Sequence, residues 1–171
     1  MHDFECPKLF TTHADDFPLS GEVLLDLLQT VLAKGVPFRF KARGWSMSPF
    51  ILDGDVITIA PLSERNPGVG YVVAFIRPEY GNLVVHRIVA RHGNHALIHG
   101  DGIPEFPDGI IPLPNILGSV IRIERNNRRI WLGLGPERIL IAWLSRVKLL
   151  TPLRVCIAAI RRPFTHREHR T

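Results

Sequence analysis

Between residues 36 and 132, short apolar segments follow one another at close intervals, separated by stretches that contain Gly, Pro, Asn or Asp. In the first of them, apolar and basic side chains alternate from Val36 to Arg43, which predicts a half-buried strand. The chain of 171 residues contains 14 Gly and 14 Pro, a composition that favours short strands and tight turns over a helical bundle. We therefore predict a mainly β fold built on an antiparallel or mixed, barrel-like sheet.

The apolar segments place the expected strands at residues 36–42, 56–60, 71–76, 83–90, 95–99, 120–123 and 129–132. The segment 71–76 is almost continuously apolar, which is typical of a central strand. The last two strands are expected to form a hairpin closed around Asn126-Asn127. Residues 100–117 are rich in Gly and Pro and are predicted to be a loop.

Helical periodicity occurs at both ends of the chain. Ser20 has the character of an N-cap, apolar residues recur at helical spacing up to Leu32, and Gly35 closes the helix. After Pro136 the periodicity returns in an apolar stripe formed by Ile139, Leu140, Trp143, Leu144, Val147 and Leu150. Thr151-Pro152 would end this helix, and a second one would span 153–160. We thus divide the chain into an arm and helix (1–35), a β domain (36–135) and a basic helical tail (136–171).

The basic charge of the protein is concentrated in its C-terminal part. Residues 122–171 carry 12 Lys and Arg against 3 Asp and Glu, whereas residues 1–121 carry 9 against 13. An anionic partner such as membrane lipid or nucleic acid fits this asymmetry, and so does an ordinary solvated face. Residues 136–162 would then contact a membrane surface peripherally, or the helices would pack on their own sheet or on a second copy.

Neither a secretory signal nor a membrane anchor is expected. The first residues, Met1 to Glu5, are acidic where a signal would be basic, and no stretch reaches ~18 consecutive apolar residues. The two cysteines, Cys6 and Cys156, lack a CxxC spacing, so we expect reduced thiols, with a disulfide as the alternative. We predict a cytoplasmic protein, or one at the inner membrane surface if the tail binds lipid.

One polar residue stands out in the loop after the first strand. Ser46 lies between Trp45 and Met47, with Gly44 and Pro49 on either side to shape the backbone. Such a loop can hold a serine oxygen at the lip of a sheet, or its serines can merely satisfy turn hydrogen bonds. A nucleophilic serine needs a base, and His86, in a strand of apolar residues, is the best candidate. The alternative is a core histidine bonded to backbone.

The segment from Gly44 to Pro49, followed by Asp53-Gly54-Asp55, resembles the nucleophile box of signal peptidase I and of the LexA-like self-cleaving repressors. Val85-His86-Arg87-Ile88 and then Gly100-Asp101 resemble the second and third boxes of that superfamily, and the likeness covers residues 36–123. Bacterial signal peptidases carry Lys at the base position, so His86 is closer to the archaeal and endoplasmic-reticulum type. The resemblance implies a serine peptidase with a LexA/signal-peptidase-like β domain, no metal and no other cofactor.

Carried over to this chain, the resemblance implies that Ser46 is the nucleophile and His86 the general base. The carboxylate that orients the imidazole would be Asp101, which matches the Gly-Asp box directly, or Asp108, in a loop that could also reach. The backbone N–H of Ser46 would contribute to an oxyanion hole, where one donor is worth about 2.7–4 kcal/mol. The oxyanion and substrate-binding side of the site is assigned to Gly44, Met47 and Pro49.

Two departures from the family pattern shape the expected substrate. Gly44 stands where signal peptidases often have Ser, so a side-chain donor to the oxyanion is missing, as in the LexA-like branch. The chain has no Ala-Gly or Cys-Gly dipeptide, the bond that LexA-like proteins cut in themselves, so self-cleavage of that kind is not expected. We expect a separate peptide or protein precursor, cut at a small residue and bound as an added strand.

Other functions fit the sequence less well. A peptidase-like module that binds peptides without turnover is favoured by two departures from the family pattern. One is Gly44, and the other is Gly70, because Gly68-Val69-Gly70 stands where the family commonly has Gly-Asp before the central strand. Nucleic-acid binding through residues 136–171 ranks last because aromatic residues are not interleaved with the charge, and no specific nucleic-acid partner is expected. A metal site is suggested by a cluster of potential ligands but not expected, because neither Cys nor an HExxH motif accompanies them. These ligands are His86, His92, His95, His99 and Asp101.

Overall fold

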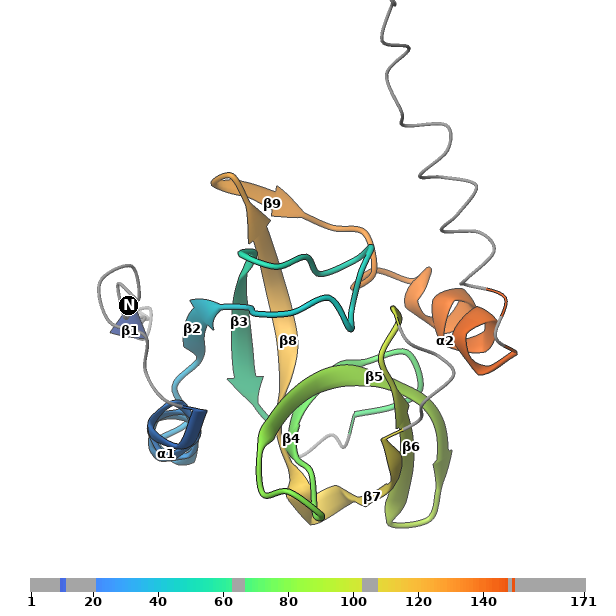
Figure 1. Ribbon diagram of the computed structural model, residues 1–171, viewed down its shortest axis with the longest axis horizontal. Helices are drawn as coiled ribbons and strands as arrows, with labels where there is room; N and C mark the ends of the chain where they lie inside the picture. Colours follow the sequence, from blue (N-terminus) through green and yellow to red (C-terminus); the bar gives the residue numbers. More distant parts are fainter. Residues whose placement is uncertain (1–9, 12–20, 63–66, 103–107, 148, 150–171) are drawn as a thin grey trace, which may run out of the picture.

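The computed structural model describes residues 10–11, 21–62, 67–102, 108–147 and 149. Their strands belong to one sheet, flanked by two α-helices, so the predicted mainly β class is confirmed (Figure 1). The predicted N-cap Ser20, the cysteines and the second C-terminal helix at 153–160 lie outside the described residues. None of the helices in the described ranges combines the length and apolar character that crossing a bilayer requires.

The strands are β1 (Phe10–Thr11), β2 (Phe38–Lys41), β3 (Val56–Pro61), β4 (Val72–Ile76), β5 (Leu83–His92), β6 (His95–His99), β7 (Gly109–Pro112), β8 (Ile116–Arg125) and β9 (Arg128–Ile130). The helices are α1 (Gly21–Ala33), the short 3₁₀ helix η1 (Leu113–Asn115) and α2 (Arg138–Arg146). The predicted strands are therefore present, and the predicted hairpin turns at Asn126 and Asn127, which both have positive φ. The prediction that residues 100–117 form a loop is wrong for the second half of this segment, which forms β7, η1 and the start of β8.

The sheet has the order β1-β2-β3-β8-β4-β5-β6-β7, with β9 paired to β8. Every pairing is antiparallel except that between β1 and β2, which is parallel. Because β1 and β7 are the two ends of this order, the described sheet is open and strongly curved, and it does not close into a barrel (Figure 1). Register shifts in the β3–β8, β4–β8 and β5–β6 pairings accompany the bending.

Two apolar cores follow from this curvature. The first lies between α1 and the strands β2, β3 and β8, and includes the fully buried Leu28, Phe38 and Ile57. The second is enclosed by the curl of β4 to β7 and includes Phe75 and Ile98. The β2–β3 loop and the first part of β5 lie where the two halves of the sheet meet, and both carry predicted site residues.

The C-terminal helix α2 packs with a different face from the one expected. Its buried residues are Ile141, Ala142 and Ser145, which lie toward β5 and the loop at Phe50. Of the predicted stripe, only Leu144 is partly buried in that contact. The other described stripe residues, Ile139, Leu140, Trp143 and Val147, are exposed, so the expectation that the stripe packs on its own sheet is wrong for these four.

Candidate active site

Ser46 lies in the loop that joins β2 to β3. Backbone hydrogen bonds close the base of this loop, since the N–H of Ala42 donates to the carbonyl of Asp55 at 2.7 Å and Gly54 N–H donates to Ala42 at 2.9 Å. The loop then turns tightly, and Met47 accepts the N–H of Ile51 at 3.0 Å. The two strands thereby hold the serine in one place at the edge of the first core.

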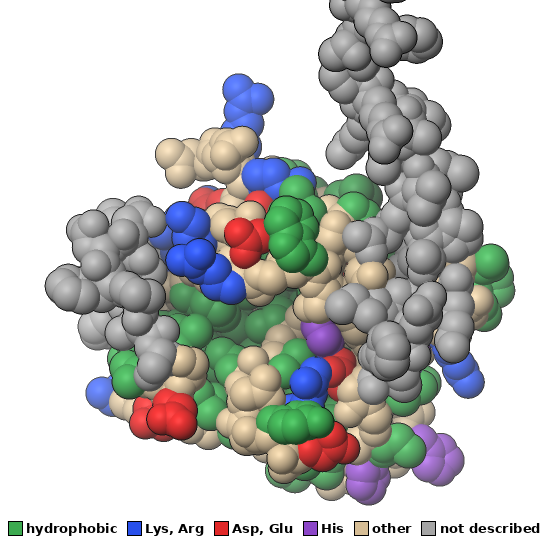
Figure 2. Space-filling model, viewed as in Figure 1, with side chains coloured by type: hydrophobic (Ala, Val, Ile, Leu, Met, Phe, Trp, Pro, Cys, Tyr) green, Lys and Arg blue, Asp and Glu red, His purple; other side chains and the backbone are tan. Residues whose placement is uncertain are grey.

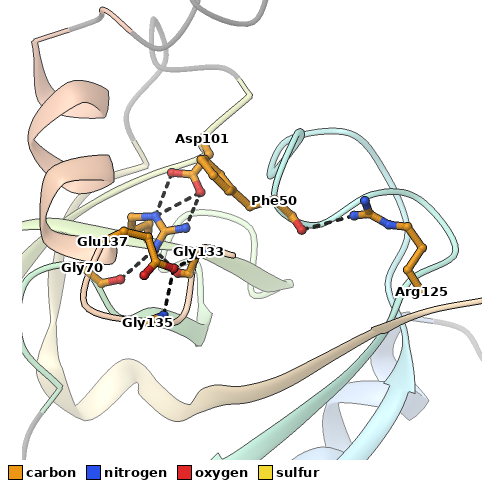
Figure 3. Close-up of polar contacts among 8 residues, drawn as sticks. Phe50, Gly70, Asp101, Arg125, Gly133, Gly135 and Glu137 are labelled. Atoms are coloured by element: carbon orange, nitrogen blue, oxygen red, sulfur yellow. Dashed lines mark hydrogen bonds and ion pairs between the residues drawn. The ribbon is translucent and has the colours of Figure 1, made fainter. Parts of the chain in front are cut away.

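Asp53 and Asp55, the two acidic residues of the segment that resembles the nucleophile box, both form hydrogen bonds that stabilise this loop. Asp53 accepts the N–H of Gly44 at 2.8 Å, across the loop. Asp55 is almost fully buried and forms an ion pair with Arg125, which donates to it from two nitrogens at 2.8 and 2.7 Å. Arg125 also donates to the carbonyl of Phe50 at 3.3 Å (Figure 3). This hydrogen bond to Asp55 raises the pKa of Arg125. Both carboxylates therefore stabilise the loop rather than face a ligand.

Gly44 has a φ of +94°, a backbone conformation that side chains disfavour. The loop therefore requires glycine at this position. The positive φ of Gly44 thus gives a physical reason why no side-chain donor stands at this position.

His86 lies in β5, opposite Val73 of β4, and is 8% exposed. Its Nε2 atom is 2.7 Å from Oγ of Ser46, a normal hydrogen-bond distance between residues that come from separate segments of the chain. The serine and the histidine predicted as a catalytic pair are thus in direct contact.

The opposite ring nitrogen, Nδ1 of His86, is hydrogen-bonded to Oδ2 of Asp108, immediately before β7. The other carboxylate oxygen accepts from Arg77, at the end of β4. Burial of Asp108 raises its pKa, but the hydrogen bonds and charges of His86 and Arg77 outweigh this, and the net pKa lies below its ordinary value. An ionised Asp108 can only accept, so Nδ1 of His86 is the donor of this hydrogen bond, and in a neutral imidazole Nε2 is then the acceptor that faces the Ser46 hydroxyl.

Asp101, the other predicted carboxylate, has a different partner. It is fully buried and paired with Arg87, whose Nε and Nη2 donate to it at 2.7–3.0 Å. The same guanidinium donates to the carbonyls of Gly70 and Gly133, each at 2.8 Å (Figure 3). Burial raises the pKa of Asp101, and the charge and hydrogen bonds of Arg87 act in the opposite direction. Of the two carboxylates left open by the sequence, the structure places Asp108 at the imidazole and Asp101 at Arg87.

The turn after β6 packs against the β2–β3 loop, which we call the nucleophile loop after the sequence box that its residues resemble. Gly102 N–H donates to the Ser46 carbonyl at 2.6 Å. A Cβ atom on Gly102 would lie 2.5 Å from the Trp45 carbonyl oxygen, and one on Gly100 would lie 2.7 Å from that of Ser46 and 3.1 Å from Nε2 of His86. Glycine is therefore required at both positions so that the backbone can approach Ser46 and His86.

A pocket of about 530 Å³ opens beside Ser46 and His86. Apolar side chains from α1, β2, the nucleophile loop, β3 and β5 form much of its wall: Leu24, Phe40, Met47, Ile51, Ile57 and Val85. Lys41 and Arg43 also line it, and Figure 2 shows a hollow with hydrophobic side chains at its floor, a histidine at its edge and basic side chains nearby. Such a pocket suits an apolar side chain in a longer ligand.

Only some of the residues predicted for the oxyanion and substrate-binding side of the site line the pocket. Gly44 and Met47 line the pocket, whereas half-buried Pro49 does not belong to its described wall. Sequence reasoning did not identify Arg77, Arg87 or Arg125 as partners of acidic residues. A signal existed for Arg87, which lies within an apolar run, because a buried charge needs a partner of opposite sign.

The histidine cluster considered for metal binding is dispersed. His92 and His95 face each other across the β5–β6 hairpin and are exposed, while His86 is engaged with Ser46 and Asp108. In the described part of the chain, no group of three His, Cys, Asp or Glu side chains is arranged to hold a metal ion.

Comparison with known proteins adds no further assignment to this site, because no protein-family model and no curated protein matches the chain.

Proposed function

We propose that this protein is a serine peptidase of the LexA/signal-peptidase-like type, with Ser46 as nucleophile, His86 as general base and Asp108 as the carboxylate that orients the imidazole. The observation that carries the proposal is the 2.7 Å contact between Oγ of Ser46 and Nε2 of His86, with Asp108 on the opposite ring nitrogen. The open pocket beside the pair supports it, because a substrate side chain can enter there.

In the proposed reaction, Oγ of Ser46 attacks the carbonyl carbon of a peptide bond while Nε2 of His86 takes the hydroxyl proton. The resulting imidazolium, stabilised by Asp108, gives that proton to the departing amine as the C–N bond breaks, which leaves an ester on Ser46. A water molecule, deprotonated by His86, then hydrolyses the ester and regenerates the serine. General base catalysis of this kind typically raises the rate 10²–10⁴-fold, which corresponds to about 3–5 kcal/mol of activation free energy.

Charge on the carbonyl oxygen would be stabilised by backbone donors. Gly44 has no side chain to offer, so the N–H of Ser46 is the donor that we assign to the oxyanion. One preorganised donor contributes about 2.7–4 kcal/mol to the transition state.

The proposed substrate is an extended segment of a peptide or protein precursor, cut at a small residue. In the described residues, β1 already pairs in parallel with β2 at Phe38 and Arg39, so a bound segment would extend this edge beyond β1 or replace β1 on it. The apolar wall of the pocket would receive a side chain of that segment.

Cleavage of a peptide library by the full chain tests the proposal, with products identified by mass spectrometry. We expect Ser46→Ala to abolish cleavage while it leaves the fold intact, because the substitution removes only one oxygen. Cleavage that persists undiminished in Ser46→Ala would contradict the assignment.

A peptide-binding module without turnover is the second candidate, and Gly44 favours it because no side-chain donor reaches the oxyanion. This candidate predicts library peptides that bind to the wild type and to Ser46→Ala equally and emerge uncut. Uncut but bound peptides would therefore replace the first proposal by the second.

A further inference from the structure

The outward face of α2 is apolar along its whole length. Ile139 (60% exposed), Leu140 (58%), Trp143 (55%) and Val147 (41%) lie within one arc of the helix, at spacings of one, three and four residues. We call these four residues the α2 ridge. Figure 1 shows α2 at the periphery of the molecule, on the opposite side from α1.

Among the residues that the structure describes, none buries the α2 ridge. The opposite face of the helix makes the intramolecular contacts through Ile141, Ala142 and Ser145, and Arg138 lies over the ring of Tyr71 at 4.2 Å. An exposed row of one aromatic and three aliphatic side chains is costly in water, so a partner that buries it is the economical explanation.

The charge around the α2 ridge indicates which partner. Residues 122–171 contain 12 Lys and Arg and 3 Asp and Glu. The two acidic residues of this part that the structure describes are already engaged, since Glu124 pairs with Arg39 and Arg122, and Glu137 accepts backbone N–H groups of Gly133 and Gly135. Exposed Arg146 flanks the ridge on the same helix. The C-terminal part of the chain that carries the ridge is therefore rich in basic residues, and its described acidic side chains are occupied.

Two copies that met through the α2 ridge would bring two such cationic segments together, and their repulsion opposes a dimer. A bilayer with anionic headgroups offers both an apolar phase for the ridge and negative charge for the arginines. Trp143 is also of the residue type that favours the interface between lipid headgroups and acyl chains. We propose that the α2 ridge is a docking surface for an anionic phospholipid bilayer, on which the helix lies parallel to the membrane.

The test uses the full chain and sedimentation with vesicles of phosphatidylcholine, either alone or with about one part in four of phosphatidylglycerol. Binding is expected to the anionic vesicles and to weaken steeply as the salt rises from about 0.05 to about 0.5 M. Trp143→Glu should weaken it about ten- to hundredfold, because it removes the largest apolar side chain of the ridge and adds a negative charge. Trp143→Phe should retain binding.

The matched control is Tyr80→Glu, which changes another aromatic residue that is 71% exposed but lies in the β4–β5 turn. It should bind vesicles like the wild type. Thermal unfolding of each variant checks that α2 remains folded, which the 55% exposure of Trp143 leads us to expect.

A protein with Trp45→Phe and Trp131→Phe retains Trp143 as its single tryptophan and reports the environment of the ridge directly. Its fluorescence should be open to acrylamide quenching in solution and become protected and blue-shifted with anionic vesicles. Three results would overturn the proposal: no binding to anionic vesicles, equal binding by Trp143→Glu, or protection of Trp143 before vesicles are added. If Trp143 is protected before vesicles are added and light scattering shows a dimer, the ridge binds a second copy of the chain. If light scattering shows a monomer, the ridge is covered by the chain's own C-terminal segment.

Discussion

At the scale of single residues, Asp101 and Asp108 show how the partner of a carboxylate decides its role. Asp101 is enclosed with Arg87, and neither side chain is exposed. Asp108 is shared between His86 and Arg77, at the edge of the pocket, where it accepts from Nδ1 of the imidazole whose other nitrogen meets Ser46. One acid thus stabilises the protein and the other organises the site.

The lowered pKa of Asp108 predicts how the stability of the site depends on pH. The pairing with His86 and Arg77 favours the ionised form, so its contribution to folding is fully present above the ordinary pKa of 3.8 and is lost as the pH falls through the lower folded value. The free energy of unfolding of the wild type should therefore exceed that of Asp108→Asn most clearly above pH 3.8, and the difference should shrink below it. Urea unfolding of both proteins across acidic pH measures this, and a difference that grows on acidification would refute it.

At the scale of elements, the site depends on four segments that meet: the β2–β3 loop, the start of β5, the turn after β6 and Asp108 immediately before β7. The turn contributes no side chain to the catalytic contacts, yet its glycines permit the approach. The position of Ser46 therefore depends on the backbone of Gly100 and Gly102. In the sequence, this turn is recognisable only as the Gly100-Asp101 box.

Gly102→Ala should displace the nucleophile loop, because the new Cβ would lie 2.5 Å from the Trp45 carbonyl oxygen. A displacement on the order of 1 Å costs about 10²-fold in rate, so the reaction of Ser46 with a phosphonate should slow by that order. Gly68→Ala is the control, since its Cβ would meet no atom closer than 4.0 Å. Equal rates in the two variants would show that the turn does not position Ser46.

Sequence patterns predicted those elements whose periodicity is local. Strands β2 to β6 follow from alternation and turn residues, whereas β7 was missed because Gly109–Pro112 is short, lies in a Gly- and Pro-rich stretch, and is a strand only through its pairing with β6. The packed face of α2 could not be predicted because apolar residues occupy most of its circumference. The choice between Asp101 and Asp108 depended on where Arg87 points, which only the folded chain defines.

At the scale of the whole molecule, the Arg87–Asp101 pair connects segments distant in sequence. Arg87 of β5 joins the turn after β6, the loop before β4 and the chain between β9 and α2 through three partner groups: the Asp101 carboxylate and the carbonyls of Gly70 and Gly133. Its ring neighbour Phe50 belongs to the nucleophile loop, with the guanidinium 5.4 Å from the ring centroid. The pair therefore ties both halves of the sheet to α2.

Asp101→Asn should lower the free energy of unfolding by about 3–5 kcal/mol, because it leaves the Arg87 charge buried without a counter-ion. Against a typical total of about 5–15 kcal/mol, that loss is large and should be plain in urea unfolding. Arg122→Gln breaks a surface pair whose arginine is 48% exposed and should cost no more than about 1 kcal/mol. Similar losses in the two variants would contradict a special role for the buried pair.

The central claim is that Ser46, His86 and Asp108 act together as nucleophile, base and orienting acid, and the rate of phosphonylation at Ser46 tests it most directly. A fluorophosphonate should modify the wild type at Ser46, as located by peptide mass spectrometry, and should leave Ser46→Ala unmodified. Asp108→Asn should react about 10²–10⁴-fold more slowly, because the imidazole loses its orienting carboxylate. A folded wild type that is not modified at Ser46, or an Asp108→Asn variant that reacts at the wild-type rate, would contradict the account.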